Sequence, residues 1–96
     1  MVSYALRPRA RRDLDHIWSY TTERWGEAQA ERYINDLRST LERVAADPAR
    51  GRPCEDIRAG YFKIASGSHL VFYRVRTGGI EVVRILHQRM DVGRHL

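Results

Sequence analysis

The stretch that decides the fold is residues 69–88, HLVFYRVRTGGIEVVRILHQ. It contains two runs rich in aromatic and β-branched residues, 69–76 and 80–88, which are separated by Thr77-Gly78-Gly79. Glycine allows the positive φ that a tight turn requires, so the pattern predicts an antiparallel hairpin. The second run is apolar on both faces at residues 82–86, which is typical of a strand that is covered on both sides.

The sequence on the N-terminal side of this hairpin predicts the rest of the sheet. Residues 61–65 are a further β-rich run before Ser66-Gly67-Ser68, and they predict a third strand of the same antiparallel meander. Residues 2–6 alternate in polarity and end at Arg7-Pro8, which predicts a first strand. Residues 48–59 hold two prolines and a glycine without periodicity, so we expect an ordered loop that leads into the sheet.

Two helices are predicted between the first strand and this loop. Pro8 suits a first helical turn, and Gly26 is typical of a helix end. Apolar or small residues recur at helical spacing on both sides of Gly26, at Ala10, Leu14, Ile17, Trp18, Thr21 and Trp25, then at Ala30, Tyr33, Ile34, Leu37, Leu41, Val44 and Ala45. Asp47-Pro48 ends the second helix. The connection is so short that the two helices must form an antiparallel hairpin.

The whole chain of 96 residues is therefore predicted to be a single α+β domain. Its expected order is β-α-α-β-β-β. The N-terminal strand is followed by an antiparallel helical hairpin, which packs on an antiparallel strand meander.

Charge is distributed unevenly along the chain. Residues 1–48 contain equal numbers of arginines and acidic residues, so the net charge of +5 lies entirely in residues 49–96. Almost every cation is an arginine, which binds carboxylate or phosphate groups in a bidentate manner. A GC-rich coding sequence explains the preference for arginine equally well, but it does not explain the asymmetry. The asymmetry predicts a basic surface that receives an acidic protein segment or a phosphate backbone.

Several classes of protein are disfavoured by the composition. The lone Cys54 excludes an internal disulfide, and His16, His69 and His95 lack the spacing of a metal site, so we expect no metal and no cofactor. No apolar run is long enough to span a membrane, and residues 1–25 are too charged for a signal peptide. We therefore expect a cytoplasmic protein that does not bind a membrane.

Candidate site residues cluster on the meander and in the segment that follows it. They are Tyr61, Lys63, Arg74, Arg84, His87 and Arg89. A cation within an apolar strand either pairs with a carboxylate of the chain, such as Glu55, Asp56 or Glu81, or faces an acidic partner. Both alternatives remain open at this point.

His87 and the two tryptophans also have two readings each. His87 is either a structural residue bonded to a backbone carbonyl, which is the favoured reading, or a general acid or base in RNA cleavage. Trp18 and Trp25 lie seven residues apart on one helix face, so packing in the core is favoured over a role as interface anchors.

A series of short motifs, in order along essentially the whole chain, resembles a known family. The motifs are Leu6-Arg7-Pro8 with Ala10 and Asp13-Leu14, Ile17-Trp18, Trp25-Gly26, Tyr33 with Leu37, Pro48, Gly51-Arg52, Arg58, Gly60-Tyr61, Phe72-Tyr73-Arg74, Ile85-Leu86-His87-Gln88-Arg89-Met90-Asp91 and His95-Leu96. This set resembles the ParE toxins of bacterial toxin–antitoxin modules, within the RelE/ParE superfamily. The resemblance implies the same strand and helix order as the pattern predicts.

The resemblance also implies a function and two partners. ParE-like toxins are held inactive by a ParD antitoxin, whose acidic C-terminal segment folds around the toxin, commonly in a heterotetramer. Free ParE toxins inhibit DNA gyrase through their C-terminal end, and direct nucleic-acid binding by the toxin alone is not expected. The residues that we expect to serve antitoxin binding or toxicity are Trp18, Trp25, Tyr61, Arg74, Arg84, His87, Arg89, Met90 and Asp91. For the antitoxin, we expect an apolar groove between the helical hairpin and the sheet, rimmed by arginines.

The RelE branch of the superfamily offers the alternative function, which is cleavage of mRNA on the ribosome. Only Lys63, Arg84 and His87 match the basic and histidine positions that such cleavage uses. RelE-like nucleases usually carry several lysines, whereas this chain has one. Gln88 also stands where YoeB-like members have a tyrosine after the terminal histidine. The resemblance therefore favours gyrase inhibition without catalysis.

Overall fold

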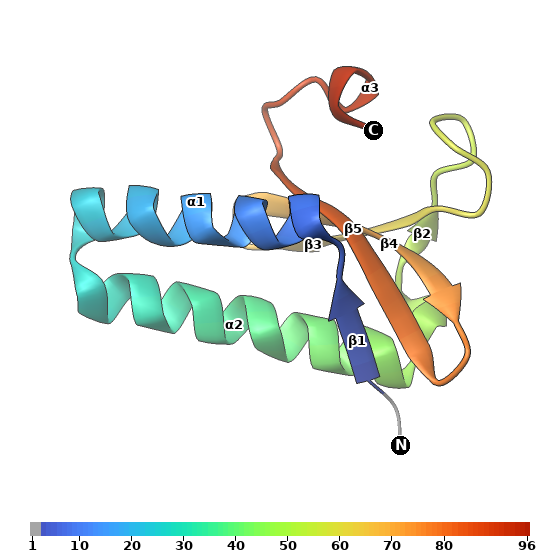
Figure 1. The fold of residues 1–96 in the computed structure, drawn as a ribbon, viewed down its shortest axis with the longest axis horizontal. Coiled ribbons are helices and arrows are strands. Elements are labelled where there is room, and N and C mark those ends of the chain that lie inside the picture. Colours follow the sequence, from blue (N-terminus) through green and yellow to red (C-terminus); the bar gives the residue numbers. More distant parts are fainter. Residues whose placement is uncertain (1–2) are drawn as a thin grey trace.

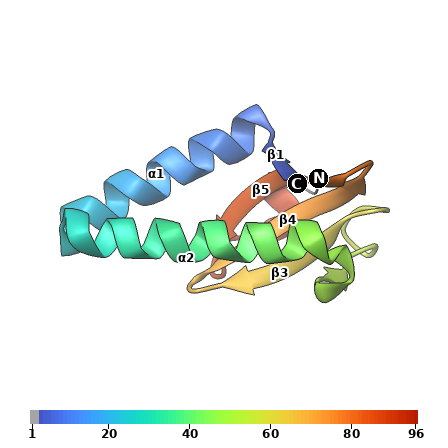
Figure 2. The ribbon, with the colours of Figure 1, turned by 90° about the horizontal axis from the view of Figure 1, so that it is seen from below.

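The computed structural model describes residues 3–96. It consists of a five-stranded mixed sheet with a helical hairpin on one face (Figures 1 and 2). Its elements are β1 (Ser3–Leu6), α1 (Pro8–Trp25), α2 (Glu27–Ala46), the 3-10 turn η1 (Pro48–Arg50), β2 (Arg52–Pro53), β3 (Phe62–Ser66), β4 (His69–Arg76), β5 (Gly79–His87) and α3 (Val92–His95). The predicted α+β class and element order are confirmed, and none of these helices has the length and apolarity needed to cross a membrane.

The sheet has the strand order β1-β5-β4-β3-β2. Strands β3, β4 and β5 form the predicted antiparallel meander, and β1 joins β5 in parallel at one edge. The predicted first strand is confirmed from Ser3 onward, while Val2 lies outside the described residues. Gly79 has a φ of +154°, and a Cβ there would collide with the Ser3 carbonyl oxygen, so glycine is needed where β1 meets β5.

Two short elements were not predicted. The segment expected to be a loop, 48–59, contains η1 and the two-residue strand β2, which pairs with β3. The chain also ends in α3, a single helical turn beyond the last strand. Both elements are too short to show a hydrophobic period, so the sequence pattern carries no signal for either of them.

The main core lies between the helical hairpin and the sheet. Gly26, with a φ of 90°, ends α1 and precedes α2, and this reversal brings both helices onto the same face of the sheet. The buried members of this core are Ala10, Ile17, Leu37, Leu41, Val44, Ala45, Val71, Tyr73, Ile80, Val82 and Ile85. The Tyr73 hydroxyl donates a hydrogen bond of 2.7 Å to the Pro48 carbonyl, so even the deepest aromatic side chain has a polar partner.

A second, smaller core covers the other face of the sheet. It consists of Cys54, Tyr61, Phe72, Val83 and Leu86, and the partly buried Ile57, Leu70, Val92 and Leu96 pack against it. Val92 and Leu96 come from the C-terminal segment, residues 88–96, which we call the tail. The tail leaves β5 and crosses this face of the sheet (Figure 1). Strand β5 is therefore covered on both faces, as its sequence predicts.

The favoured reading of the two tryptophans is wrong. Trp25 is 66% exposed and Trp18 is 37% exposed, so neither belongs to the core. The end of the hairpin that joins α1 and α2 extends beyond the sheet, and its outer faces have nothing to pack against (Figures 1 and 2). Helical spacing shows which residues share a face, but it does not show how far the sheet extends beneath that face.

We expect Trp25→Ala to change the free energy of unfolding by less than about 0.5 kcal/mol, because the indole ring is mostly in solvent. Leu37→Ala is the matched control, since Leu37 is 1% exposed and its truncation should cost about 2–5 kcal/mol. Urea denaturation followed by circular dichroism measures both. A loss above 2 kcal/mol for Trp25→Ala would mean that this ring is buried in solution.

Candidate functional site

A bidentate ion pair joins α1 to β5. Arg84 donates from Nε to Asp13 Oδ2 at 2.8 Å and from Nη2 to Asp13 Oδ1 at 2.9 Å. The Asp13 Oδ2 atom also accepts the backbone N–H of Ile85 at 2.9 Å. Strand β1 ends at Leu6, opposite Val82, so the edge of β5 beyond that point is free for the carboxylate. Asp13 therefore provides the acceptor that a neighbouring strand would otherwise supply.

The same guanidinium holds the tail. Arg84 Nη1 donates to the carbonyl of His95 at 2.9 Å, and Arg84 is only 9% exposed. The hydrogen bond to Asp13 raises the pKa of Arg84, against the opposing effect of burial. Of the two readings of a cation in an apolar strand, pairing within the chain holds for Arg84. Its partner is Asp13, which lies 71 residues away in sequence and was not among the expected carboxylates.

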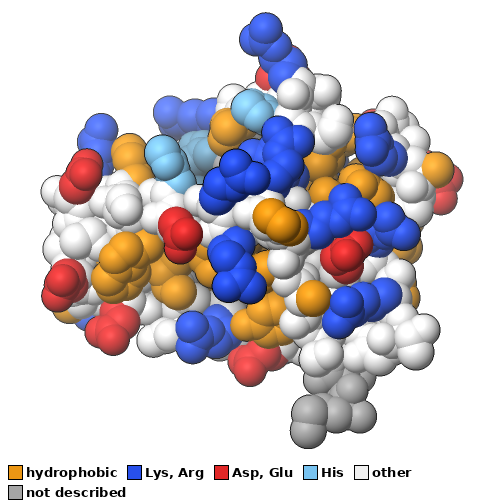
Figure 3. All heavy atoms as spheres, viewed as in Figure 1, with side chains coloured by type: hydrophobic (Ala, Val, Ile, Leu, Met, Phe, Trp, Pro, Cys, Tyr) orange, Lys and Arg blue, Asp and Glu red, His pale blue; other side chains and the backbone are white. Residues whose placement is uncertain are grey.

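The other cations of the cluster are arranged differently. Arg74 lies 3.8 Å from Glu81, which also contacts Arg7 at 3.2 Å, and the Arg74 side chain remains 49% exposed. Lys63 forms no ion pair among residues 3–96. Figure 3 shows many Lys and Arg side chains over the sheet and the tail, in agreement with the uneven charge of the sequence.

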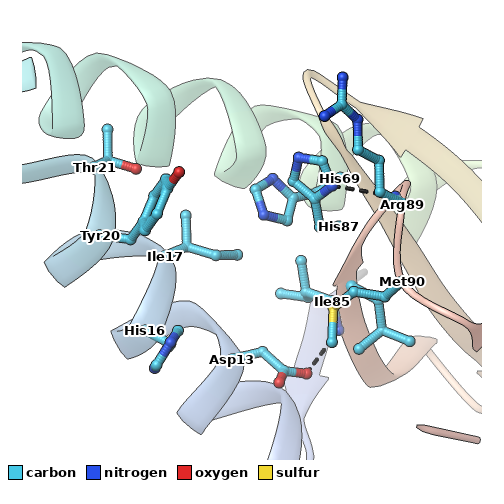
Figure 4. A pocket seen from close by; sticks show the side chains of 11 residues that line it. Asp13, His16, Ile17, Tyr20, Thr21, His69, Ile85, His87, Arg89 and Met90 are labelled. Atoms are coloured by element: carbon cyan, nitrogen blue, oxygen red, sulfur yellow. Dashed lines mark hydrogen bonds between the residues drawn. The ribbon is translucent and has the colours of Figure 1, made fainter. Parts of the chain in front are cut away.

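An apolar groove of about 440 Å³ opens between α1 and the C-terminal end of β5 (Figure 4). We call it the histidine groove; it is lined by Asp13, His16, Ile17, Tyr20, Thr21, His69, Ile85, Leu86, His87, Arg89 and Met90. A groove between the helical hairpin and the sheet was expected. Its rim holds three histidines and one arginine, however, instead of a row of arginines. No group of three or more His, Cys, Asp or Glu side chains within residues 3–96 is arranged to bind a metal ion.

Two of the histidines form a pair across neighbouring strands. His69 of β4 lies opposite His87 of β5, and their rings are 5.3 Å apart between centroids at an angle of 81°. Tyr33 of α2 places its hydroxyl 2.6 Å from Nδ1 of His69. The Tyr33 oxygen accepts the backbone N–H of Ser68 at 2.9 Å, and its own proton has two acceptors within reach, Nδ1 of His69 and the Ser66 carbonyl at 3.4 Å, of which Nδ1 is the nearer. Burial, and then the neighbouring His87, lower the pKa of His69 below its ordinary value of 6.5.

The favoured reading of His87, a bond to a backbone carbonyl, is wrong for the residues that the structure describes. The Nδ1 atom of His87 instead accepts the backbone N–H of Arg89 at 3.1 Å, which turns the chain into the tail. Met90 lines the groove beside it. Asp91 lies further along and accepts the N–H of Gly93 at 3.1 Å, which caps α3.

The expected site residues therefore fall into separate places. His87, Arg89 and Met90 share the histidine groove, whereas Tyr61 is buried on the opposite face under Arg58, whose guanidinium lies 5.8 Å from the ring. Trp18 and Trp25 lie outside the groove on α1, and Arg74 lies on the sheet.

Eight of the groove residues were missed as site residues, and those with polar side chains are Asp13, His16, Tyr20, Thr21 and His69. The pairing of His69 with His87 has a signal in the sequence. Counting outward from the Gly78-Gly79 turn places these two residues within one position of each other. The register shift between Phe72 and Tyr73 removes that remaining offset, and no sequence pattern predicts this irregularity.

The three residues considered for RNA cleavage are not brought together. Lys63 lies opposite Phe72, and Phe72 lies opposite Arg84, so the two cations share the face that carries the second core. His87 follows Ile85 by two residues and lines the groove beside α1, on the other face. The side chain of His87 therefore leaves the sheet on the face opposite to those of the two cations.

Comparison with known proteins identifies relatives over nearly the full chain. Residues 4–92 match the model of the family described as the ParE toxin of the type II toxin–antitoxin system, parDE. The protein named Toxin ParE1 of Mycobacterium tuberculosis is 52% identical over 94 residues, which cover 97% of this chain and 96% of the relative.

Two solved structures share the fold. A chromosomal ParDE TA system from P. aeruginosa has a TM-score of 0.78 at 22% identity, covering 91% of this chain and 96% of its own. A YoeB–YefM complex from Staphylococcus aureus has a TM-score of 0.61 at 13% identity, covering 92% and 98%.

We expect Asp13→Asn to lower the free energy of unfolding by about 3–5 kcal/mol, because it leaves Arg84 buried without a counter-charge. The double variant Asp13→Asn, Arg84→Met should recover part of this lost stability, since the uncompensated cation is removed. Arg74→Met is the control, because its contact with Glu81 is exposed and contributes less than about 1 kcal/mol. Equal losses in the single and double variants would contradict a buried ion pair.

His69 should make the fold less stable as the pH falls. Because its pKa is lowered in the folded protein, the unfolded chain binds more protons near pH 6.5, and stability decreases as the pH drops below that value. We expect His69→Gln to flatten the dependence of the unfolding free energy on pH between pH 5 and 7. Carboxylates titrate in both proteins alike, so the difference between the two pH curves reports His69. If the pH curves of wild type and His69→Gln run parallel, burial does not lower the pKa of His69.

Proposed function

The chain belongs to the ParE toxin family, as a toxin of a type II toxin–antitoxin system, and on this premise we propose that it inhibits DNA gyrase and is neutralised by direct binding of a ParD-type antitoxin. The observation that carries the proposal is the extent of the family match, which spans residues 4–92 and includes the histidine groove and the start of the tail. The proposal places its action in the cytoplasm, where it arrests growth without a cofactor.

The structure offers a candidate surface for the target. The tail begins at the histidine groove, where Arg89 is exposed and Met90 is 38% exposed. Both residues belong to the end of the chain that the resemblance associates with toxicity. A cation beside an exposed thioether is suited to contact with another protein, since both side chains are enriched at interfaces.

The arrangement of Lys63, Arg84 and His87 supports a non-catalytic toxin over a RelE-like ribonuclease. His87 and the two cations leave the sheet on opposite faces, and Arg84 is already engaged by Asp13 and the His95 carbonyl. Stabilising the charge of a phosphorane requires cations on the same side as the acid–base group. The similarity to the YoeB–YefM complex, at 13% identity, supports a common fold alone.

The antitoxin is the second partner in the proposal. The P. aeruginosa structure is by its title a ParDE system, and the S. aureus structure is a complex of YoeB with YefM. We expect the acidic C-terminal segment of a ParD-type protein to contact the exposed members of the predicted set in a heterotetramer or larger complex. These members are Trp18, Trp25, Arg74, Arg89, Met90 and Asp91. Tyr61 and Arg84 are buried, so we expect them to make no direct contact with the antitoxin.

A supercoiling assay with purified gyrase tests the proposed target. Excess toxin should inhibit supercoiling and trap gyrase on cleaved DNA, and an equimolar amount of the antitoxin should restore activity. Arg89→Glu should weaken inhibition at least about tenfold by reversing a charge at the contact. Arg76→Glu is the matched control, because it reverses an exposed arginine at the far end of β4.

A parallel toe-printing experiment on translating ribosomes examines the alternative function. If the chain inhibits gyrase without catalysis, no new mRNA cleavage should be seen. Unaffected gyrase at toxin excess, together with cleavage that is lost in His87→Ala, would establish the RelE-like activity instead.

A further inference from the structure

The histidine groove presents hydrogen-bond donors and has no free carboxylate of its own. Asp13 is the one acidic residue that lines it, and both of its oxygens are occupied, by Arg84 and by the N–H of Ile85. The charged or potentially charged side chains that remain in the lining, His16, His69, His87 and Arg89, are basic, and Tyr20 adds a hydroxyl. The walls between them are apolar, with Ile17 on one side and Ile85 on the other (Figure 4).

The contacts at Nδ1 favour the same tautomer for the two paired histidines. Nδ1 of His87 accepts the N–H of Arg89, and we assign the Tyr33 proton to Nδ1 of His69 because this contact of 2.6 Å is shorter than the one of 3.4 Å to the Ser66 carbonyl. In a neutral imidazole the other nitrogen then carries the hydrogen, so each ring presents an Nε2–H donor. No hydrogen bond within residues 3–96 occupies either Nε2 atom. Figure 4 shows the two rings close together, across the groove from Ile17 and Tyr20.

Two adjacent N–H donors beside an apolar wall match a specific chemical group. A carboxylate has two acceptor oxygens, which can take one hydrogen bond from each ring. A neighbouring aliphatic or aromatic side chain of the same ligand would pack on Ile17, Tyr20 and Met90. A peptide segment with an acidic residue beside an apolar one has both groups, and the net charge of +5 favours its approach.

We propose that the antitoxin places an acidic residue and a neighbouring apolar residue in the histidine groove. His69 and His87 bind the carboxylate of this acidic residue, and the complex takes up a proton when it forms. The inference rests on the proposed function, because it assigns a docking position and a pH response to the antitoxin partner. It gives the paired histidines a role as a proton-linked receptor for a carboxylate, distinct from acid–base chemistry.

The proton goes to Nδ1 of His69. Tyr33 then reverses its hydrogen bond, accepting from Nδ1–H and donating its own proton to the carbonyl of Ser66, which lies 3.4 Å away. Its oxygen keeps the N–H of Ser68, so every donor in this network retains an acceptor. Protonation of His87 at Nδ1 would instead break its bond to Arg89 N–H, so His69 is the better receiver.

The neighbours of His69 explain why the proton is absent before binding. The groups that face it are Tyr33 from α2, Asp13, His16 and Tyr20 from α1, His87 from β5 and Arg89 beyond it. Burial and His87 lower the pKa of His69, and Asp13 opposes them only weakly. A carboxylate placed against the ring adds an opposite charge and raises this pKa. Binding should therefore tighten as the pH falls.

Isothermal titration calorimetry with the full-length toxin and a full-length ParD-type antitoxin tests the inference. Affinity should increase at least about threefold from pH 8 to pH 6, because a rise of about one unit in one pKa gives at most a tenfold gain. Titrations at a fixed pH in phosphate and in Tris, which differ in ionisation enthalpy, should show net uptake of protons. The melting temperature of each variant is measured first, so that only folded proteins are compared.

Variants of the two histidines distinguish the contribution of proton uptake to the affinity from that of the hydrogen bonds. His69→Gln keeps an N–H donor but cannot be protonated, so its affinity should stay within about threefold of wild type at pH 8 and lose the gain at pH 6. The double variant His69→Ala, His87→Ala should bind at least about tenfold more weakly at both pH values. His95→Gln removes an imidazole outside the groove and is the matched control.

Each outcome bears on a different claim. Tight binding without pH dependence, or unchanged binding by the alanine double variant, would overturn the inference and leave the proposed antitoxin partnership intact. Failure of the antitoxin to bind at any pH would overturn the proposed partnership itself and, with it, the inference. Competition by a short RNA that depends on the same two histidines would assign the groove to a phosphate backbone and refute the peptide anchor.

Discussion

The ion pair between Asp13 and Arg84 is the contact on which the arrangement of the site depends. One carboxylate completes the free edge of β5 and neutralises a cation that is 9% exposed. The same cation holds the tail through the His95 carbonyl. The first helix, the most buried strand and the last residues of the chain therefore meet at one salt bridge. The position of α1 against β5, which forms the histidine groove, follows from this contact.

Much of the fold could be predicted because its signals are local. Turn glycines mark the two hairpins, and Gly26 with Asp47-Pro48 marks the ends of the helices. The exposure of Trp18 and Trp25 could not be predicted, since it depends on where the sheet ends beneath the hairpin. The same limit applies to Asp13, because no local pattern links a carboxylate in a helix to an arginine 71 residues later.

The candidate site shows a similar division. Its general position between the hairpin and the sheet agrees with the groove that was expected for the antitoxin. The separation of Arg84 from His87 follows from strand alternation alone, because three positions separate them within β5. The face of Lys63 depends on the register between strands, and the bulge near Phe72 and Tyr73 changes that register by one residue, so this face cannot be assigned from the sequence alone. Side chains that look like one basic cluster in sequence thus occupy two surfaces.

The bond from Arg84 to the tail has a consequence for how such a protein can change over generations. Its acceptor is the main-chain carbonyl of residue 95, which is present whatever the side chain at that position. The path of the tail is thus set by a residue of β5, and a substitution at position 95 retains the acceptor. Mutation can alter the surface that the tail presents at this position while the anchorage persists, so recognition of a cellular target can diversify without rebuilding the scaffold.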